Sequence, residues 1–251
     1  MIQLKNKKIL ITGASSGIGK SIALMCSKLG AKTILIGRKE EEIKKVINSM
    51  DNPTYHSYLI ADIKEHSELE IKLKQKIHDF GQLDGVVHSA GMEMTRPLKM
   101  LKIKNLDEVM QINLYAPINI TRILTRKGHF NENGGSIIFI SSIVGMFGQS
   151  GKSGYSASKG ALISAGKSLA LEFASKNIRV NSVVPAMVKT DMSINLLKKL
   201  SDESVKEIEN MHPLGIGTPE DVANSVVFLL SDLAKWITGA SFVVDGGYSS
   251  S

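Results

Sequence analysis

The sequence predicts a single α/β domain over residues 1–251, built on a doubly wound parallel sheet of about seven strands with helices on both faces. Short runs that are apolar throughout alternate with longer amphipathic segments, and strands with both faces buried have this pattern. A glycine-rich turn joins the first apolar run directly to the first amphipathic segment. Neither a linker nor a repeat divides the chain, so we expect right-handed crossovers within one domain.

The alternation assigns each element in turn. We expect strands at residues 9–11, 33–36, 57–60, 83–88, 136–140, 178–184 and 241–244. We expect helices at residues 18–29, 40–50, 67–80, 106–126 and 155–176, and a last helix after Thr218. Ser67 and Glu70 have the spacing of a capping box, and Thr218 followed by Pro219 is typical of a helix start.

Residues 186–217 interrupt the alternation, and we expect them to form a substrate lid within the domain. Connections longer than about 12–15 residues are usually functional. The stretch has enough apolar residues for two short helices: Leu196, Leu197, Leu200, Val205, Ile208 and Met211.

Composition excludes several classes of protein. The chain has 43% hydrophobic and 22% charged residues, which excludes disorder, and its one cysteine, Cys26, excludes a disulfide-stapled miniprotein. The net charge is +7, but the lysines are scattered, so no nucleic-acid partner is expected. No run approaches the roughly 18 apolar residues that span a membrane, and no signal peptide is recognisable, so we expect a cytoplasmic protein. The six histidines form no i, i+4 pair, and no metal site is expected.

The glycine-rich turn predicts a dinucleotide site of the Rossmann type. Gly13 allows the tight turn, Gly17 the approach of a pyrophosphate, and Gly19 close packing of helix on strand. Backbone N–H groups and the positive end of the helix then face the phosphates. The residues of this turn expected to bind the cofactor are Gly13, Ser15, Ser16, Gly17, Ile18 and Gly19.

The end of the second strand favours NADP(H) over NAD(H). A carboxylate there binds the ribose 2′-hydroxyl of NAD, whereas an arginine accommodates the 2′-phosphate of NADP. This chain has Gly37 and Arg38 at that point. The alternative is that Arg38 is a surface residue paired with Glu41 or Glu42.

A tyrosine and a lysine four residues apart open the longest expected helix. Tyr155 and Lys159 therefore lie on one face, a turn apart. A nearby ammonium lowers the pKa of a phenol from its ordinary value of about 10 towards neutral pH, where proton transfer is most efficient. Ser141 and Ser142 follow an expected strand, at the edge where such sheets bind ligands. We expect Ser142 to face the site and Ser141 to be structural.

These motifs, together with others in the same order, resemble the classical short-chain dehydrogenase/reductase family over essentially the whole chain. The further matches are Asp62 after the third strand, Ala90-Gly91 after the fourth, Asn113, Pro185 with Thr190, and Asp245-Gly246-Gly247.

The resemblance implies a role for each catalytic residue. Tyr155 would be the general acid that protonates the substrate carbonyl, and Ser142 would orient the same oxygen. Lys159 would also bind the nicotinamide ribose, and Asn113 would hold a water that relays protons to Lys159. The remaining implied cofactor contacts are Asp62 and Ile63 at adenine, Ser89, Ala90 and Gly91 near the adenosine ribose, and Pro185, Val188 and Thr190 near the carboxamide.

The sequence departs from the family pattern at two places. His88-Ser89 stands where members usually have Asn-Asn, which removes an amide that braces the sheet. Ala186 stands where a glycine commonly follows Pro185, which reduces backbone freedom at the base of the lid.

Within the family, the chain is most similar to bacterial 3-oxoacyl-[acyl-carrier-protein] reductases in length, in the Ser142–Tyr155 spacing and in residues 172–181. This similarity implies reduction of a carrier-bound 3-oxoacyl thioester, with Lys176 matching a basic position that docks the acidic carrier near the site. Asn133 stands where many of these reductases have arginine. Methionines line adaptable apolar surfaces, and those expected round the pocket favour an apolar substrate: Met92, Met94, Met146, Met187 and Met192.

Two alternatives remain open. The same catalytic residues serve oxidoreductases that act on a sugar, a polyol or another small alcohol or ketone, and a binding protein could sense NADP(H) without chemistry. A serine hydrolase is excluded because the sequence has no Gly-x-Ser-x-Gly motif. The resemblance also implies a homotetramer that packs through the helices near 106–126 and 155–176 and through the C-terminal strand.

Overall fold

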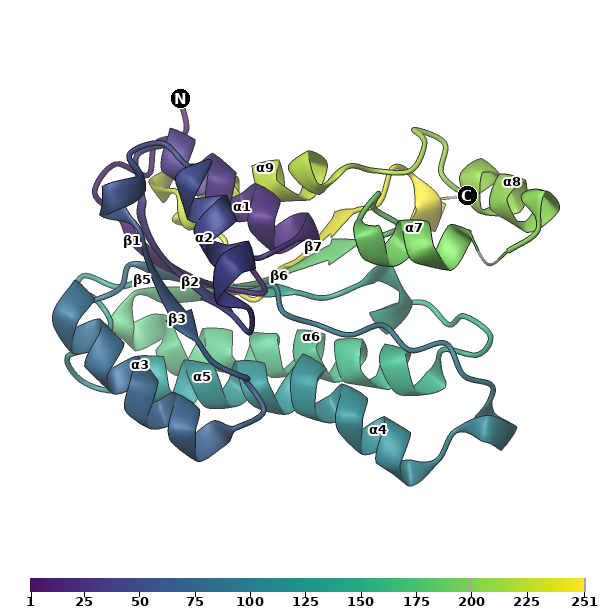
Figure 1. Cartoon of the computed structure of the whole chain (residues 1–251), viewed down its shortest axis with the longest axis horizontal. Helices are drawn as coiled ribbons and strands as arrows, with labels where there is room; N and C mark the ends of the chain where they lie inside the picture. The colour runs from purple at the N-terminus through teal and green to yellow at the C-terminus, as the bar shows by residue number, and fades with distance from the viewer. Residues whose placement is uncertain (199, 251) are drawn as a thin grey trace.

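The computed structural model describes residues 1–198 and 200–250, and this part of the chain forms one parallel sheet between two layers of helices (Figure 1). The strand order is β3-β2-β1-β4-β5-β6-β7, and every neighbouring pair is parallel, as the sequence predicts. The strands are β1 (Lys8–Thr12), β2 (Lys32–Gly37), β3 (Ser57–Ile60), β4 (Gly85–His88), β5 (Gly135–Ile140), β6 (Ile178–Pro185) and β7 (Ser241–Val244).

The helices divide between the two faces of the sheet. One face is covered by α1 (Gly17–Lys28), α2 (Glu40–Asn48) and α9 (Pro219–Leu230). The other face is covered by α3 (His66–Phe80), α4 (Ile103–Met110), α5 (Ala116–Leu124) and α6 (Ser153–Phe173). Two short helices, α7 (Asp191–Leu197) and α8 (Asp202–Asn210), lie beyond the carboxyl end of β6, within the segment expected to be a lid (Figure 1).

Strands that are apolar throughout supply both halves of the core. Ile9 and Ile11 of β1 pack into the cluster under α1, α2 and α9, while Leu10 packs into the cluster under α3, α5 and α6. All three side chains are fully buried. Because successive residues of a strand point to opposite faces, an unbroken apolar run is what a sheet covered on both sides requires.

The long helix expected at 106–126 is interrupted. After α4, residues Gln111–Tyr115 form a π-helical turn, and α5 begins at Ala116 with Pro117 in its first turn. Insertions of this kind are rare and occur often at functional sites. The turn carries Asn113, whose side chain is fully buried.

One capping prediction is wrong and one is confirmed. Ser67 lies inside the first turn of α3, which begins at His66, so the hydroxyl cannot cap the helix. Glu70 instead accepts hydrogen bonds from Arg122 of α5 and from Arg126, which follows that helix. Thr218 caps α9, and its hydroxyl accepts a hydrogen bond from the backbone N–H of Asp221 at 3.3 Å.

The strand order reverses between β1 and β4, which leaves a crevice at the carboxyl ends of the central strands. Open α/β sheets bind ligands in such a crevice. Along the described chain no helix is both long and apolar enough to cross a membrane.

Candidate active site

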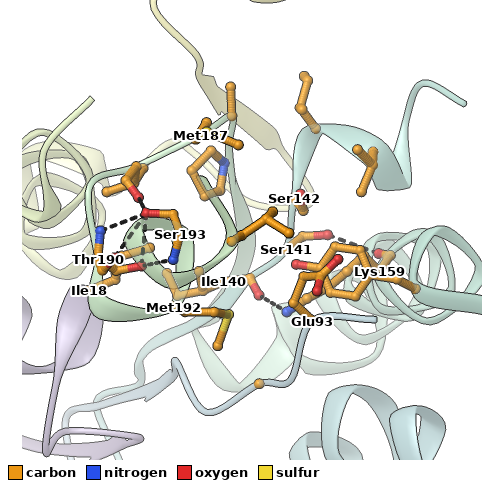
Figure 2. Close-up of a pocket in the computed structure, with 18 of the residues that line it drawn as sticks. Ile18, Glu93, Ile140, Ser141, Ser142, Lys159, Met187, Thr190, Met192 and Ser193 are labelled. Atoms are coloured by element: carbon orange, nitrogen blue, oxygen red, sulfur yellow. Dashed lines mark hydrogen bonds between the residues drawn. The ribbon is translucent and has the colours of Figure 1, made fainter. Parts of the chain in front are cut away.

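Two adjoining cavities of about 490 Å³ and 230 Å³ occupy this crevice. Ile18, Gly91, Met92 and Thr190 line both, so the two form one continuous cleft. In the smaller cavity, Ser141, Ser142 and Lys159 lie on one side and Thr190, Met192 and Ser193 on the other (Figure 2).

The glycine turn is shaped for a dinucleotide pyrophosphate. Gly13 has φ +67°, and a Cβ there would lie 2.7 Å from Ala90 Cα, so a side chain would displace the β4 exit. A Cβ on Gly19 would collide with the carbonyl oxygen of Gly13, and one on Gly17 would lie 3.2 Å from Thr190 Cγ2. No acidic side chain lies in the first turn of α1, so the positive end of this helix is free to face an anion. The residues present therefore fit a bound dinucleotide.

Every residue predicted to contact the cofactor lines one of the two cavities. The larger cavity is lined by Gly13, Ser15, Ser16, Gly17, Ile18, Gly19, Arg38, Asp62, Ile63, Ser89, Ala90, Gly91 and Thr190. The smaller one is lined by Tyr155, Lys159, Pro185 and Val188 in addition to residues it shares.

Arg38 is exposed at the rim of the larger cavity. The alternative pairing with Glu41 or Glu42 is not formed, since Glu42 binds Lys39 at 2.9 Å and, among the described residues, Arg38 makes no ion pair. Its guanidinium is therefore available to an anion in the cavity.

The reactive side chains all line the smaller cavity. Ser142 follows β5, and Tyr155 and Lys159 lie in the first turns of α6. Lys159 is fixed from both ends, because its ammonium donates to the Ile140 carbonyl at 2.8 Å and its own carbonyl accepts from Ser141 Oγ at 2.9 Å. The ammonium lies 6.0 Å from the centroid of the Tyr155 ring. The Ser141 hydroxyl thus bonds to the backbone of α6.

Burial has opposite effects on the two ionisable groups. It raises the pKa of Tyr155 to about 12, and a hydrogen bond with Ser142 offsets only part of this rise. It lowers the pKa of Lys159 to about 8. The sequence predicts that Lys159 makes the phenol more acidic, but in this structure burial is the largest effect on the pKa of Tyr155, and it raises that pKa. The phenol of Tyr155 is protonated at neutral pH and can act as an acid.

Asn113 lies beneath the catalytic residues and outside both cavities. Its Nδ2 donates to the Met92 carbonyl and to Ser158 Oγ, both at 3.0 Å, and its Oδ1 accepts from Met92 N–H at 2.8 Å. The Ser158 hydroxyl donates in turn to the carbonyl of Tyr155 at 2.7 Å. Asn113 therefore joins the segment after β4 to the start of α6, which positions Tyr155.

His88 fills the place of the usual asparagine as a neutral, fully buried ring. Its Nε2 shares a hydrogen bond of 2.9 Å with Thr121 Oγ1, and the ring stacks on Phe139 with centroids 5.0 Å apart. Burial lowers the pKa of His88 to about 3. His88 therefore joins β4 to α5 by its hydrogen bond and packs against β5 through Phe139.

Three methionines expected at the pocket lie there, and two do not. Met92, Met187 and Met192 line the smaller cavity, as does Met211. Met94 is instead buried against Gly154 in α6, and the side chain of Met146 is exposed. Lys176, the expected contact with the carrier protein, lies far from Tyr155 of the same chain. Lys176 follows the far end of α6, 21 positions beyond Tyr155, which at about 1.5 Å per residue is roughly 30 Å away.

Sequence reasoning missed an ion pair and a histidine in the smaller cavity. Lys152 binds Glu93 at 2.8 Å beside Tyr155, and His212 accepts from the Met187 N–H at 3.3 Å. The position of Lys152, three residues before Tyr155 at the start of the same helix, was a usable signal. Nothing local marks Glu93 or His212, because each reaches the site from a connecting segment.

A dinucleotide cleft with a serine, a tyrosine and a lysine at its inner end defines an oxidoreductase that acts on a carbonyl or alcohol group. A family model described as enoyl-(acyl carrier protein) reductase matches residues 13–249. The chain belongs to the short-chain dehydrogenase/reductase family.

Relatives span the chain almost completely. A 3-oxoacyl-[acyl-carrier-protein] reductase FabG of Rickettsia prowazekii (strain Madrid E) is 41% identical over 249 residues, 98% of each chain. The protein of the same name from Thermotoga maritima is 32% identical over 98% of this chain and 99% of its own. A crystal structure of a Brucella melitensis short-chain dehydrogenase/reductase, described as a glucose/ribitol dehydrogenase, superposes with a TM-score of 0.90 at 28% identity, covering 98% of both chains.

Proposed function

We propose that this protein is an NADP(H)-dependent reductase of 3-oxoacyl thioesters carried on acyl carrier protein. The observation that carries the proposal is the grouping of Ser142, Tyr155 and Lys159 in the smaller cavity, which is continuous with the dinucleotide cavity. The 32–41% identity to reductases of that name supports the substrate class. The methionine lining of the smaller cavity supports it as well, since such a surface adapts to an acyl chain.

The residues of the chain divide the reaction between them. Bound NADPH supplies the hydride that reduces the 3-oxo group. Tyr155 donates its phenolic proton to the carbonyl oxygen, and Ser142 holds that oxygen by a hydrogen bond. Lys159 binds the nicotinamide ribose, and Asn113 keeps the start of α6 in place.

Arg38 supports NADPH as the cofactor. An unpaired guanidinium at the cavity rim can bind a phosphate through two parallel hydrogen bonds, and Gly37 brings no carboxylate to repel it. The segment 186–217 supplies Thr190, Met192 and Met211 to the smaller cavity, so we also propose that it closes over the substrate.

The decisive assay measures NADPH oxidation by the purified protein with acetoacetyl thioesters of acyl carrier protein and of coenzyme A. We expect turnover, and we expect Tyr155→Phe to lower kcat by roughly 10²–10⁴-fold because the general acid is lost. The affinity for NADPH, measured by fluorescence titration, should remain nearly unchanged. Comparable activity in the variant would refute the role of Tyr155.

The competing function is oxidation of a sugar or polyol, which the Brucella melitensis structure favours by its description. Ribitol and glucose with NADP⁺ and NAD⁺ are therefore included in the assay. Turnover of these compounds without turnover of the thioesters would replace the proposed function. Turnover of any of these substrates would exclude the alternative of a protein that only senses the cofactor.

A further inference from the structure

An ion pair lies inside the smaller cavity, next to Tyr155, the proposed general acid. Lys152 Nζ donates to Glu93 Oε1 at 2.8 Å, and the two side chains are only 12% and 24% exposed. The same Lys152 nitrogen lies 5.7 Å from the centroid of the Tyr155 ring. Both charged residues line the cavity together with Ser142.

The surrounding backbone holds this pair in one position. Lys152 directly precedes α6, and the N–H of Arg96 donates to the carbonyl of Gly151 at 2.6 Å, which joins the two segments that carry the pair. Glu93 Oε1 also accepts from Thr95 Oγ1 at 2.5 Å. The ammonium is thus anchored on one side, and among the described residues it has no hydrogen-bond partner besides Glu93. An ammonium has three N–H donors, so two are left for a ligand.

Stability does not explain the pair. Taking an ammonium and a carboxylate out of water is costly, and apolar residues in their place are often as stabilising. The rest of the cavity wall near Tyr155 includes Ile143, Val144 and Met187, so apolar neighbours were available. A fixed, largely desolvated donor beside the reacting group is better explained by a polar atom of the substrate.

We infer that Lys152, held by Glu93, binds a second carbonyl oxygen of the substrate, so that the site selects 1,3-dicarbonyl compounds over simple ketones. This inference rests on the proposed function, in which the second oxygen is that of the thioester. The reacting oxygen lies between Tyr155 and Ser142, and in a 3-oxoacyl thioester three carbon atoms separate the two carbonyl oxygens. With Lys152 Nζ 5.7 Å from the centroid of the Tyr155 ring, we expect one such substrate to reach both donors through hydrogen bonds of about 3 Å.

Because the two charges of the ion pair cancel, we expect Lys152 to bind a neutral hydrogen-bond acceptor rather than an anion. Glu93 neutralises the ammonium and would lie close to any anion that Lys152 bound. A carbonyl oxygen gains a charge-assisted hydrogen bond without this repulsion. The pocket should therefore prefer an acetoacetyl ester or thioester to free acetoacetate.

The test compares kcat and KM for acetoacetyl coenzyme A, ethyl acetoacetate, free acetoacetate and 2-heptanone, a ketone without a second carbonyl. Lys152→Met keeps the length of the side chain and removes its donors. We expect kcat/KM to fall about 10- to 100-fold for the thioester and the ester, mostly through KM, and to change little for 2-heptanone. Glu93→Gln, which leaves Lys152 without its counter-charge, should lose selectivity for the same two compounds. Lys127→Met, at an exposed lysine after α5, is the matched control.

The outcomes separate this inference from the proposed function. Equal losses for 2-heptanone and for the dicarbonyl compounds, or no loss at all, would overturn the role of Lys152 while the reductase activity stands. A preference for free acetoacetate would overturn the claim that Lys152 binds a neutral acceptor. If the wild type reduces ethyl acetoacetate but not the thioester, and Lys152→Met loses the activity towards the ester, only the assignment of the thioester as substrate is overturned. Inactivity towards all four compounds would overturn both.

Discussion

Replacement of His88 by asparagine tests whether a buried neutral ring makes the protein sensitive to acid. The ring is enclosed between Phe139 and Thr121, and its Nδ1 atom is buried without a hydrogen-bond partner among the described residues. Burial lowers the pKa of His88 from its ordinary 6.5 to about 3. Asparagine can bond to Thr121 but does not titrate, so His88→Asn removes the ionisation and keeps a polar side chain.

The expected magnitude follows from the two pKa values. Between about pH 6.5 and pH 3 the unfolded chain binds a proton at this residue and the folded chain does not, so stability falls as the pH falls. Each unit of pH costs about 1.4 kcal/mol. From neutral pH to about pH 4.5, the free energy of unfolding should therefore fall by about 3 kcal/mol more in the wild type than in His88→Asn. The contribution of the neutral ring is fully present above pH 6.5.

Urea unfolding at several pH values and one fixed protein concentration measures this difference, because the other titrating groups are common to both proteins. His78→Asn is the control, since the His78 side chain is 84% exposed and should leave the pH dependence as it is in the wild type. If the curves of the wild type and His88→Asn stay parallel down to pH 4.5, the ring is not held neutral and the argument from burial fails.

Two further predictions concern the cofactor and the assembly. Arg38→Asp should weaken NADPH binding about 10- to 100-fold and shift preference towards NADH, because a charge-assisted contact is replaced by repulsion; unchanged selectivity in kcat/KM would mean that the 2′-phosphate is held elsewhere, for example by Ser15. Size-exclusion chromatography with light scattering should show a homotetramer, since Leu171 of α6 and Tyr115 beside α5 are 82% and 47% exposed in one chain; a monomer at micromolar concentration would contradict the packing expected of these helices.

The sheet and the cofactor cavity could be predicted because their signals are local. The apolar run Ile9-Leu10-Ile11 predicts that both faces of the first strand are covered. The structure buries alternate residues of this run in opposite layers. The glycines at 13, 17 and 19 each avoid a specific collision, so their spacing carries the geometry of the turn.

Features that depend on tertiary contacts escaped the sequence. Ser67 has the spacing of a cap, but α3 begins one residue earlier, and Glu70 accepts hydrogen bonds from Arg122 and Arg126 in and just after α5. The five-residue π-helical turn has no periodicity of its own that distinguishes it from the helices on either side. Glu93 and Lys152 lie on two segments far apart in the sequence, and the contact between these segments includes a backbone hydrogen bond that no local pattern marks.

Burial of the catalytic pair determines the protonation state from which the proposed reaction starts. Reduction needs a protonated phenol, whereas oxidation of an alcohol needs the same oxygen as a base. Desolvation keeps Tyr155 protonated in the free protein, and Glu93, whose negative charge also raises the pKa of Tyr155, acts in the same sense. Lys159 keeps most of its charge at neutral pH with a pKa of about 8, and its ammonium donates to the Ile140 carbonyl. The free site therefore holds the phenol in the protonated form from which donation to a 3-oxo oxygen starts.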